Sequence, residues 1–446
     1  MSIVQRLRER FWFIPAVLCL AAFVLAEGLV ALDERLGGLD VPGWAGTLLY
    51  RVGASGSRDV LGAIASSSLA VAGTTFSITM AVLALTSSTY GPRLVRNFMS
   101  DRGNQAVLGV FVATFLYSLL VLRSIRVIGE SGDDAFVPHL AVNAAVLLAV
   151  ADVAVLIYFI HHISDSIQIT TLTGRVRDEL LATVERLYPL PDATDVAVHG
   201  GPGAAPGPGV RDLPRPDGGA PVTAHRSGYL QSLDDDDLLR LAREHDVVVV
   251  LDVRPGAYVL QDAVVAHVLP AERADDRLAD GVRATLHLSD ARTPHQDPEF
   301  AVQQLTEMAV RALSPGTNDP YTAVNALDDL SSALSALAAR VPPARARLDA
   351  EGRLRVHAPR VGVDELVVPV IDSMRWYAAS APSVMHSTLD LVERVGTRAA
   401  SGAVRTRLLT HVGLLEDAFA GAGHHAHDMQ AFADHAGSVR ARLMSV

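Results

Sequence analysis

The chain has 446 residues, of which 50% are hydrophobic and 5% aromatic, and its formal net charge is −11. This length and apolarity are sufficient for a membrane part and a separate folded domain. The negative charge excludes nucleic acid as an expected partner, because nucleic-acid-binding proteins usually present a basic face. All 38 basic residues are arginine, and the single cysteine, Cys19, excludes an intramolecular disulfide.

Four apolar segments reach the length of about 20 residues that a helix needs to cross a bilayer core. They cover residues 11–32, 61–86, 106–122 and 136–160. The first lacks a small-residue cleavage site, so we interpret it as an anchor. Nine arginines flank one side of these segments and five flank the other, which predicts that both termini are cytoplasmic. Residues 1–162 are therefore predicted to form a four-helix transmembrane domain.

Residues 63 to 88 contain a stripe of small residues at alternating steps of four and three. An α-helix places such positions on one face. The members of this small-residue stripe are Ala63, Ser67, Ala70, Thr74, Ser77, Ala81, Ala84 and Ser88. In a spanning helix the stripe either allows close helix packing or faces water in a symmetric oligomer. On the second hypothesis the pore is lined by its hydroxyl residues, Ser67, Thr74, Ser77 and Ser88.

The second apolar segment runs into Gly91-Pro92, which must end its helix. Arg93 and Arg96 follow directly. A ring of these arginines at the inner mouth of a pore would favour anions, but the same residues also serve as topology anchors. We include both among the pore-lining candidates.

Glu27 and Asp152 are ionisable residues within the apolar segments. A charge in hydrocarbon is costly and usually faces the bundle interior or a wet cavity. Asp152 lies well inside the fourth segment, which predicts either a role in an ion pathway or a hydrogen-bonded structural role. Glu27 lies near the outer end of the first segment and is expected to reach the interface. His161 and His162 close the fourth segment and are expected to be interfacial.

An amphipathic helix is predicted over residues 163–188, because apolar residues recur there at helical spacing. Residues 189–222 contain 15 Pro or Gly among 34 residues. Such a composition buries too little surface to fold, which predicts a disordered linker. The linker separates the membrane half from residues 223–446.

Residues 223–446 are predicted to form a cytoplasmic α+β domain. Ser232 and Asp235 have the spacing of a capping box for a helix near 234–245. The stretch DVVVVLDVRPGAYVL indicates two strands around a turn at residues 254–256, and AVVAHVL indicates a third strand. Most of the chain after residue 298 is predicted to be helical.

The segment SPGTND separates two predicted helices. Asp319 has the position of an N-cap, and Pro320 that of the first helical residue. A polar loop between helices can bind a ligand or form a subunit contact, and it can also be a simple tight connection. The binding candidates are Arg311, Ser314, Asn318 and Asp319.

Three stretches resemble one bacterial family. They are FSITMAVLALTSSTYGPRLVRNFMSDRGNQAVLGVFVATFLYSLLVLRSIR, HLAVNAAVLLAVADVAVLIYFIHHI and ALSPGTNDPYTA. Through them the chain is similar to the predicted membrane proteins called domain of unknown function 2254. The resemblance implies a multi-span N-terminal half in the inner membrane and a cytoplasmic C-terminal half. It implies no catalytic residues.

The sequence contains no nucleophile elbow, Walker loop, dinucleotide fingerprint or zincin helix. We therefore expect no enzyme activity, no cofactor and no metal site. The first hypothesis is an oligomeric inner-membrane channel whose second helix lines the pore and whose cytoplasmic domain senses a ligand or assembles the ring. The alternative is a membrane-anchored sensor or scaffold that transports nothing. The expected partners are the lipid bilayer, further copies of the chain, and a small ligand or ion.

Overall fold

A computed structural model describes residues 11–36, 53–90, 101–126, 136–190 and 218–446. The chain divides into two compact units, Met1–Thr171 and Leu172–Val446, which we call the N-terminal and C-terminal units. Each unit is described by itself.

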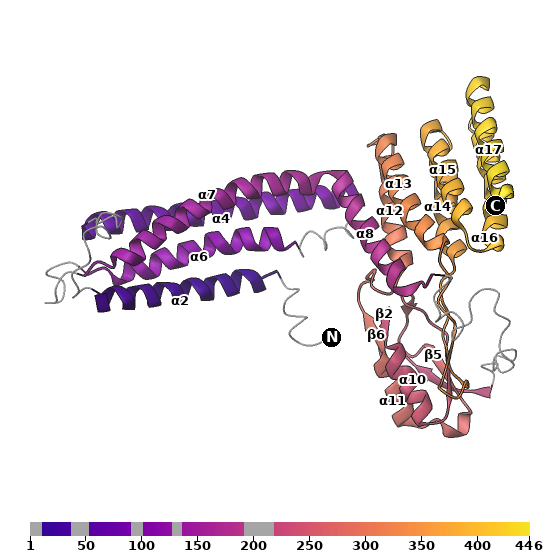
Figure 1. Ribbon diagram of the computed structural model, residues 1–446, viewed down its shortest axis with the longest axis horizontal. Helices are drawn as coiled ribbons and strands as arrows, with labels where there is room; N and C mark the ends of the chain where they lie inside the picture. The colour runs from indigo at the N-terminus through magenta and orange to yellow at the C-terminus, as the bar shows by residue number, and fades with distance from the viewer. Residues whose placement is uncertain (1–10, 37–52, 91–100, 127–135, 191–217) are drawn as a thin grey trace. The chain divides into compact units, whose positions relative to one another are not determined.

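The N-terminal unit is a bundle of four helices that lie side by side (Figure 1). They are α2 (Phe13–Leu36), α4 (Ala54–Tyr90), α6 (Arg102–Ser124) and α7 (His139–Ile167). Each is long and apolar enough to cross a membrane, which confirms the four predicted segments. Half of the α6 span is buried, compared with 11% of α2 and 22% of α4 and α7. Helix α6 is therefore the central helix, and it packs against the other three.

Two aspartates cap helices at opposite ends of this bundle. Asp101 is the N-cap of α6, and its carboxylate accepts a hydrogen bond from the backbone N–H of Gly103 at 2.8 Å. Asp33 of α2 accepts from the first backbone N–H groups of α7, at 3.2 Å from Leu140 and 3.1 Å from Ala141. Carboxylates are favourable there because a helix N-terminus has unpaired donors and a positive dipole end.

Helix α7 extends past the predicted end of the fourth segment to Ile167. The chain is extended at Gln168, and α8 (Ile169–Leu187) begins one residue later. The amphipathic helix predicted over 163–188 is thus divided between α7 and α8. No glycine or proline marks the break, so the sequence pattern did not indicate it. The apolar face of α8 is buried as expected, at Leu172, Val176, Leu180 and Val184.

The first part of the C-terminal unit holds two small sheets with helices α10 (Asp235–Glu244) and α11 (Asp276–Thr285). A five-stranded sheet has the order β1-β5-β3-β8-β7, and a three-stranded sheet has the order β4-β2-β6. All pairings are antiparallel except that of β3 with β8. The strands are β1 (Ala220–Thr223), β2 (Gly228–Leu233), β3 (Val248–Leu251), β4 (Tyr258–Val259), β5 (Val264–Leu269), β6 (Leu286–Ser289), β7 (Ala346–Leu348) and β8 (Leu354–His357).

Three details of this region differ from the sequence predictions. Strand β1 begins at Ala220, inside the end of the predicted linker, while residues 191–217 of that linker lie outside the described residues. The N-cap of α10 is Asp234, not Ser232, which belongs to strand β2. The predicted strands around residues 254–256 exist as β3 and β4, but they belong to different sheets, so the turn passes the chain from one sheet to the other.

The rest of the C-terminal unit is helical, as predicted. The helices are α12 (Pro298–Ala312), α13 (Pro320–Ala338), α14 (Val363–Tyr377), α15 (Pro382–Arg398), α16 (Gly402–Gly421) and α17 (Ala426–Ser445). Helix α13 packs against α12 and α15, and its many small residues let these neighbours approach closely. Asp319 is the N-cap of α13 and Pro320 its first residue, which confirms that prediction.

Candidate functional site

Asp152 of α7 is buried in the N-terminal bundle, with only 7% of its surface exposed. Its two carboxylate oxygens accept hydrogen bonds from two other helices. Ser68 Oγ of α4 donates to Oδ2 at 2.7 Å, and Thr114 Oγ1 of α6 donates to Oδ1 at 3.0 Å. These contacts form a polar layer of three residues, Ser68, Thr114 and Asp152, that joins three helices.

Apolar side chains pack on both sides of this polar layer. One cluster includes Leu61 and Tyr117, and lies toward the start of α4 and the end of α6. The other includes Ala72, Phe111 and Phe159, and lies toward the end of α4 and the start of α6. The carboxyl group is therefore enclosed by hydrocarbon along the bundle. In such surroundings it can hold a proton or keep its charge through the two hydroxyl donors.

Helix α4 has two faces of small residues, and the bundle covers one of them. The covered face includes Ala65, Ser68, Ala72, Thr75 and Thr79, which are all buried. The small-residue stripe is the other face, and its members from Ala63 to Ala84 are exposed. Packing among the described helices therefore uses a different face of α4 and leaves the stripe uncovered.

The hydroxyls of the stripe donate to carbonyl groups of their own helix. Ser67 bonds to Ile64 O at 3.0 Å, Thr74 to Ala70 O at 3.0 Å, and Ser77 to Gly73 O at 2.8 Å. Such bonds satisfy a hydroxyl in a lipid or at a helix interface, and leave its oxygen able to accept from water. Ser88 belongs to α4, but its side chain is not described, and Arg93 and Arg96 lie outside the described residues.

Glu27, His161 and His162 of the bundle each lie beside a group of opposite charge type. Glu27 lies 3.1 Å from the guanidinium of Arg123, and both side chains are largely exposed, as expected for an interfacial pair. His162 lies 3.1 Å from Asp101, the residue that caps α6. His161 lies 3.3 Å from Asp165 on its own helix. Among the residues that the structure describes, no group of three or more metal-ligating side chains converges.

The four loop candidates near residue 314 are held by local contacts. Arg311 donates to Glu307 one turn back on α12, at 2.9 and 3.1 Å. Ser314 donates to Thr317 Oγ1 at 3.2 Å, and Asn318 has a positive φ of 46°. The hydroxyl of Thr322 lowers the pKa of Asp319, followed by the backbone N–H of the same residue. These contacts are those of a tight helix connection, which was the structural alternative for this loop.

Sequence reasoning identified Asp152 but missed its partners, Ser68 and Thr114. Each lies in an apolar helix that contains other serine or threonine residues, so neither stands out in the sequence. They lie 84 and 38 residues from Asp152 in the chain, so no local pattern could pair them with it.

Four helices are long and apolar enough to cross a membrane, three of them meet at an enclosed carboxyl group, and a mixed unit of helices and strands follows; these features indicate a multi-pass membrane protein. The chain belongs to the predicted membrane protein family called domain of unknown function 2254, whose model matches residues 8–394. It is 32% identical over 385 residues to an uncharacterized protein of Mycobacterium bovis, covering 84% of this chain and 71% of that one. An uncharacterized protein of Mycobacterium tuberculosis matches with the same identity and coverage. No solved structure matches the chain.

Proposed function

We propose that the protein is an oligomeric inner-membrane channel in which the α4 helices of several copies surround the conduction pathway. In this proposal both termini and the C-terminal unit are cytoplasmic, and the C-terminal unit senses a ligand or assembles the ring. The small-residue stripe of each copy faces the axis of the oligomer. The carboxyl group of Asp152 holds the three helices behind that axis together.

The observation that carries the proposal is the uncovered small-residue stripe on α4. Small side chains make few van der Waals contacts with lipid, whereas they let a second helix approach closely or leave room for water. The described part of the bundle buries the other small face of α4. Helix packing within one copy of the chain therefore uses that face and leaves the stripe available for another copy. An additional copy of α4 is the simplest occupant of the exposed face.

Cysteine accessibility tests whether water reaches the stripe. Cys19 is replaced by alanine, and single cysteines are then introduced at Ser67, Thr74 and Ser77 in the full chain. In a channel, a membrane-impermeant thiol reagent modifies these positions and reduces the current of the purified protein in planar bilayers. Val150→Cys is the matched control, because Val150 is an exposed apolar residue of α7 and is expected to face lipid.

The result that overturns the proposal is equally specific. If the three positions of the stripe react no faster than Val150→Cys, and the purified protein passes no current at any voltage, tension or ligand condition, conduction is excluded.

The alternative is a membrane-anchored sensor or scaffold without transport, in which the stripe is a dry seam between copies. The hydrogen bonds from Ser67, Thr74 and Ser77 to their own helix favour it, because they leave no hydroxyl that needs water. Thr74→Leu separates the two functions. A dry seam loses oligomerisation when a bulky residue enters, whereas a pore keeps its assembly and loses conduction.

A further inference from the structure

The C-terminal unit contains a cavity of about 310 Å³ that no sequence pattern predicted. Its wall includes the end of α8, the turn after β3, the start of α10, strand β7 and the loop before α14. Five prolines contribute to the lining, at positions 189, 255, 298, 343 and 359. Since proline restricts the backbone, these segments form a stiff wall. The volume lies in the range of small-molecule sites.

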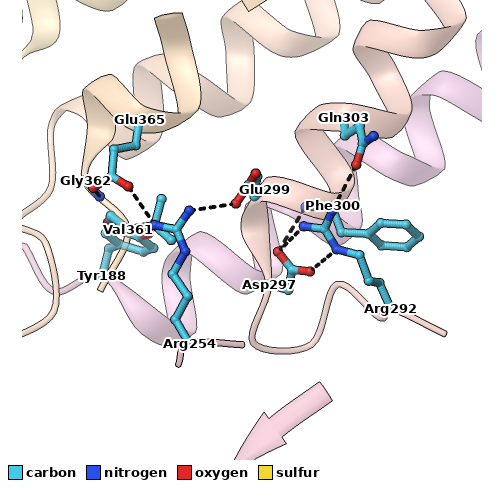
Figure 2. A network of polar contacts seen from close by, with 10 residues as sticks. All are labelled: Tyr188, Arg254, Arg292, Asp297, Glu299, Phe300, Gln303, Val361, Gly362 and Glu365. Atoms are coloured by element: carbon cyan, nitrogen blue, oxygen red, sulfur yellow. Dashed lines mark hydrogen bonds and ion pairs between the residues drawn. The ribbon is translucent and has the colours of Figure 1, made fainter. Parts of the chain in front are cut away.

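Four arginines line this cavity, and one of them, Arg254, forms ion pairs between segments of the wall. Arg254 donates to Glu299 at 3.1 Å and to Glu365 at 2.6 Å, and so ties the first turn of α12 to the first turn of α14 (Figure 2). Beside it, the hydroxyl of Tyr188 donates to the carbonyl of Val361 at 3.1 Å, which fixes the segment that follows α8. Arg254 is therefore a structural group, with its charge compensated.

Two of the other three arginines share the carboxylate that lines the cavity. Arg347 and Arg360 both donate to Asp235, at 2.7 Å and at 2.8 and 2.9 Å. Arg347 also lies 3.7 Å from Asp236, a carboxylate that is 97% exposed and screened by water. With Arg254 and its two partners Glu299 and Glu365 included, four guanidinium groups and three carboxylates leave an excess of one positive charge.

Arg186 carries its charge without a carboxylate partner in the described part of the chain. It donates only to neutral acceptors, the carbonyl of His295 and, at 3.5 Å, the hydroxyl of Thr183. The imidazole of His295 responds to this cation, since its pKa is lowered by burial and then by the charge of Arg186.

Arg360 has donor capacity that the protein leaves unused. Its side chain is 12% exposed, and its Nε atom is buried with no hydrogen-bond partner among the described residues. A buried donor without a partner is unfavourable for folding, and this atom has no surface open to a ligand. The planar guanidinium group as a whole matches the oxygens of phosphate or carboxylate groups.

We propose that this cavity binds a small organic phosphate monoester. The excess positive charge at Arg186, Arg347 and Arg360 attracts a phosphate monoester, which carries a charge of about −1.5 to −2 near neutral pH. The organic part of the ligand lies against Leu187, Ala344 and the proline wall. Arg186 is in the last turn of α8, which follows α7 after one residue, so the ligand contacts the segment that leads from the last spanning helix. The site goes beyond the proposed channel function, and its test does not require conduction.

Calorimetric titration of the full-length protein in detergent tests the site, with phenyl phosphate as the probe at about pH 7.5. Benzoate has the same ring with a carboxylate, and sodium chloride at equal ionic strength controls for screening. We expect saturable binding of phenyl phosphate and weaker binding of benzoate. Sodium chloride alone is expected to give no binding signal. Arg186→Gln and Arg347→Gln are each expected to raise the Kd about tenfold or more, because each removes a charge-assisted contact.

Arg394→Gln is the matched control, because Arg394 is a half-exposed arginine of the same unit, paired with Asp328 at 2.6 Å. It is expected to leave the Kd unchanged. Absence of saturable phenyl phosphate binding overturns the proposal, and so does binding that both cavity variants leave unchanged. Benzoate binding as tight as that of phenyl phosphate overturns the assignment of a phosphate and indicates a carboxylate ligand.

Discussion

Asp152 in the N-terminal unit and Asp297 in the C-terminal unit are two buried carboxylates with different partners. Asp152 accepts from the hydroxyls of Ser68 and Thr114. Asp297 is 2% exposed and accepts two hydrogen bonds from one edge of the Arg292 guanidinium, from Nε at 2.7 Å and from Nη2 at 2.9 Å (Figure 2). The hydrocarbon-rich bundle thus uses hydroxyls where the C-terminal unit uses a full ion pair.

The cost of desolvating the partner explains this difference. A guanidinium in the middle of a bilayer-length bundle is expensive, and arginine near helix ends can reach water instead. In the C-terminal unit Arg292 keeps 16% of its side chain exposed, and it lies over the ring of Phe300 at 5.3 Å. A hydroxyl supplies a donor to Asp152 with no second charge to bury. The medium around each carboxylate, and not the aspartate itself, therefore selects the partner.

The largest effect is expected from Asp297→Ala. This change leaves Arg292 without its buried partner and also removes the N-cap of α12, where Asp297 accepts from Phe300 N at 3.1 Å. The loss of stability is expected to be about 4 kcal/mol. Hydrogen exchange of α12 and α13 peptides in the full chain measures it. A loss below about 1 kcal/mol would show that the ion pair contributes no more than an exposed one.

A smaller effect is expected from Asp152→Ala. Two interhelical hydrogen bonds are lost, and such bonds contribute about 0.6 kcal/mol each in membrane proteins, with an upper value of about 1.7. We expect a loss of about 1–2 kcal/mol, measured by exchange of α7 peptides in detergent. Asp152→Asn keeps an acceptor for one hydroxyl and is expected to lose less. A loss equal to that of Asp297→Ala would contradict the comparison.

Mild acid is expected to destabilise the C-terminal unit through His386. Burial, and then the neighbouring His435, lower the pKa of His386 below its ordinary value of 6.5. The unfolded chain therefore binds more protons than the folded one near this pH, so stability falls as the pH drops below about 6.5. Exchange of α15 and α17 peptides should accelerate between about pH 7.5 and about pH 5.5, after correction for intrinsic rates.

The pH effect depends on the imidazole and not on its ring contacts. His386 packs against Phe432 at 5.2 Å, so His386→Phe preserves an aromatic ring in this position. The variant should lose most of the acid response of α15 and α17. An unchanged response would assign it to other groups, such as His295 and His357, whose pKa values are also lowered by burial.

The smallest effect is expected from Glu27→Gln. The ion pair of Glu27 with Arg123 has 48% and 75% of its side chains exposed, and exposed pairs contribute about 0.2–1 kcal/mol. The thermal midpoint in detergent should therefore change little, and less still at high salt. A large shift would mean that this pair lies in hydrocarbon, in contrast to its position at an interface.

Much of the fold was predictable because it depends on local patterns. The four spanning helices follow from the length of the apolar runs, and α13 follows from Asp319 and Pro320 at its start. Strand pairing was not predictable, and β3 and β4 belong to different sheets although only a short turn separates them. The break at Gln168 carries no sequence signal, since neither glycine nor proline occurs there.

The sites divide in the same way. Asp152 was recognisable because a single carboxylate in a long apolar run is unusual. The arginines of the cavity were not recognisable, because Arg186, Arg347 and Arg360 come from distant parts of a chain that is rich in arginine. The loop candidates from Arg311 to Asp319 were recognisable because their polar residues lie close together in the sequence. In the structure these residues form hydrogen bonds with near neighbours in the chain.

By itself the sequence determined which segments can enter a membrane, because burial in hydrocarbon depends on the length and polarity of continuous runs. It also specified the stripe of small residues from Ala63 to Ser88 on one face of α4. Folding set which face of α4 is covered, which hydroxyls reach Asp152, and which arginines meet around one cavity. Those outcomes depend on contacts between residues far apart in the chain, and helical spacing contains no information about the partner across the interface.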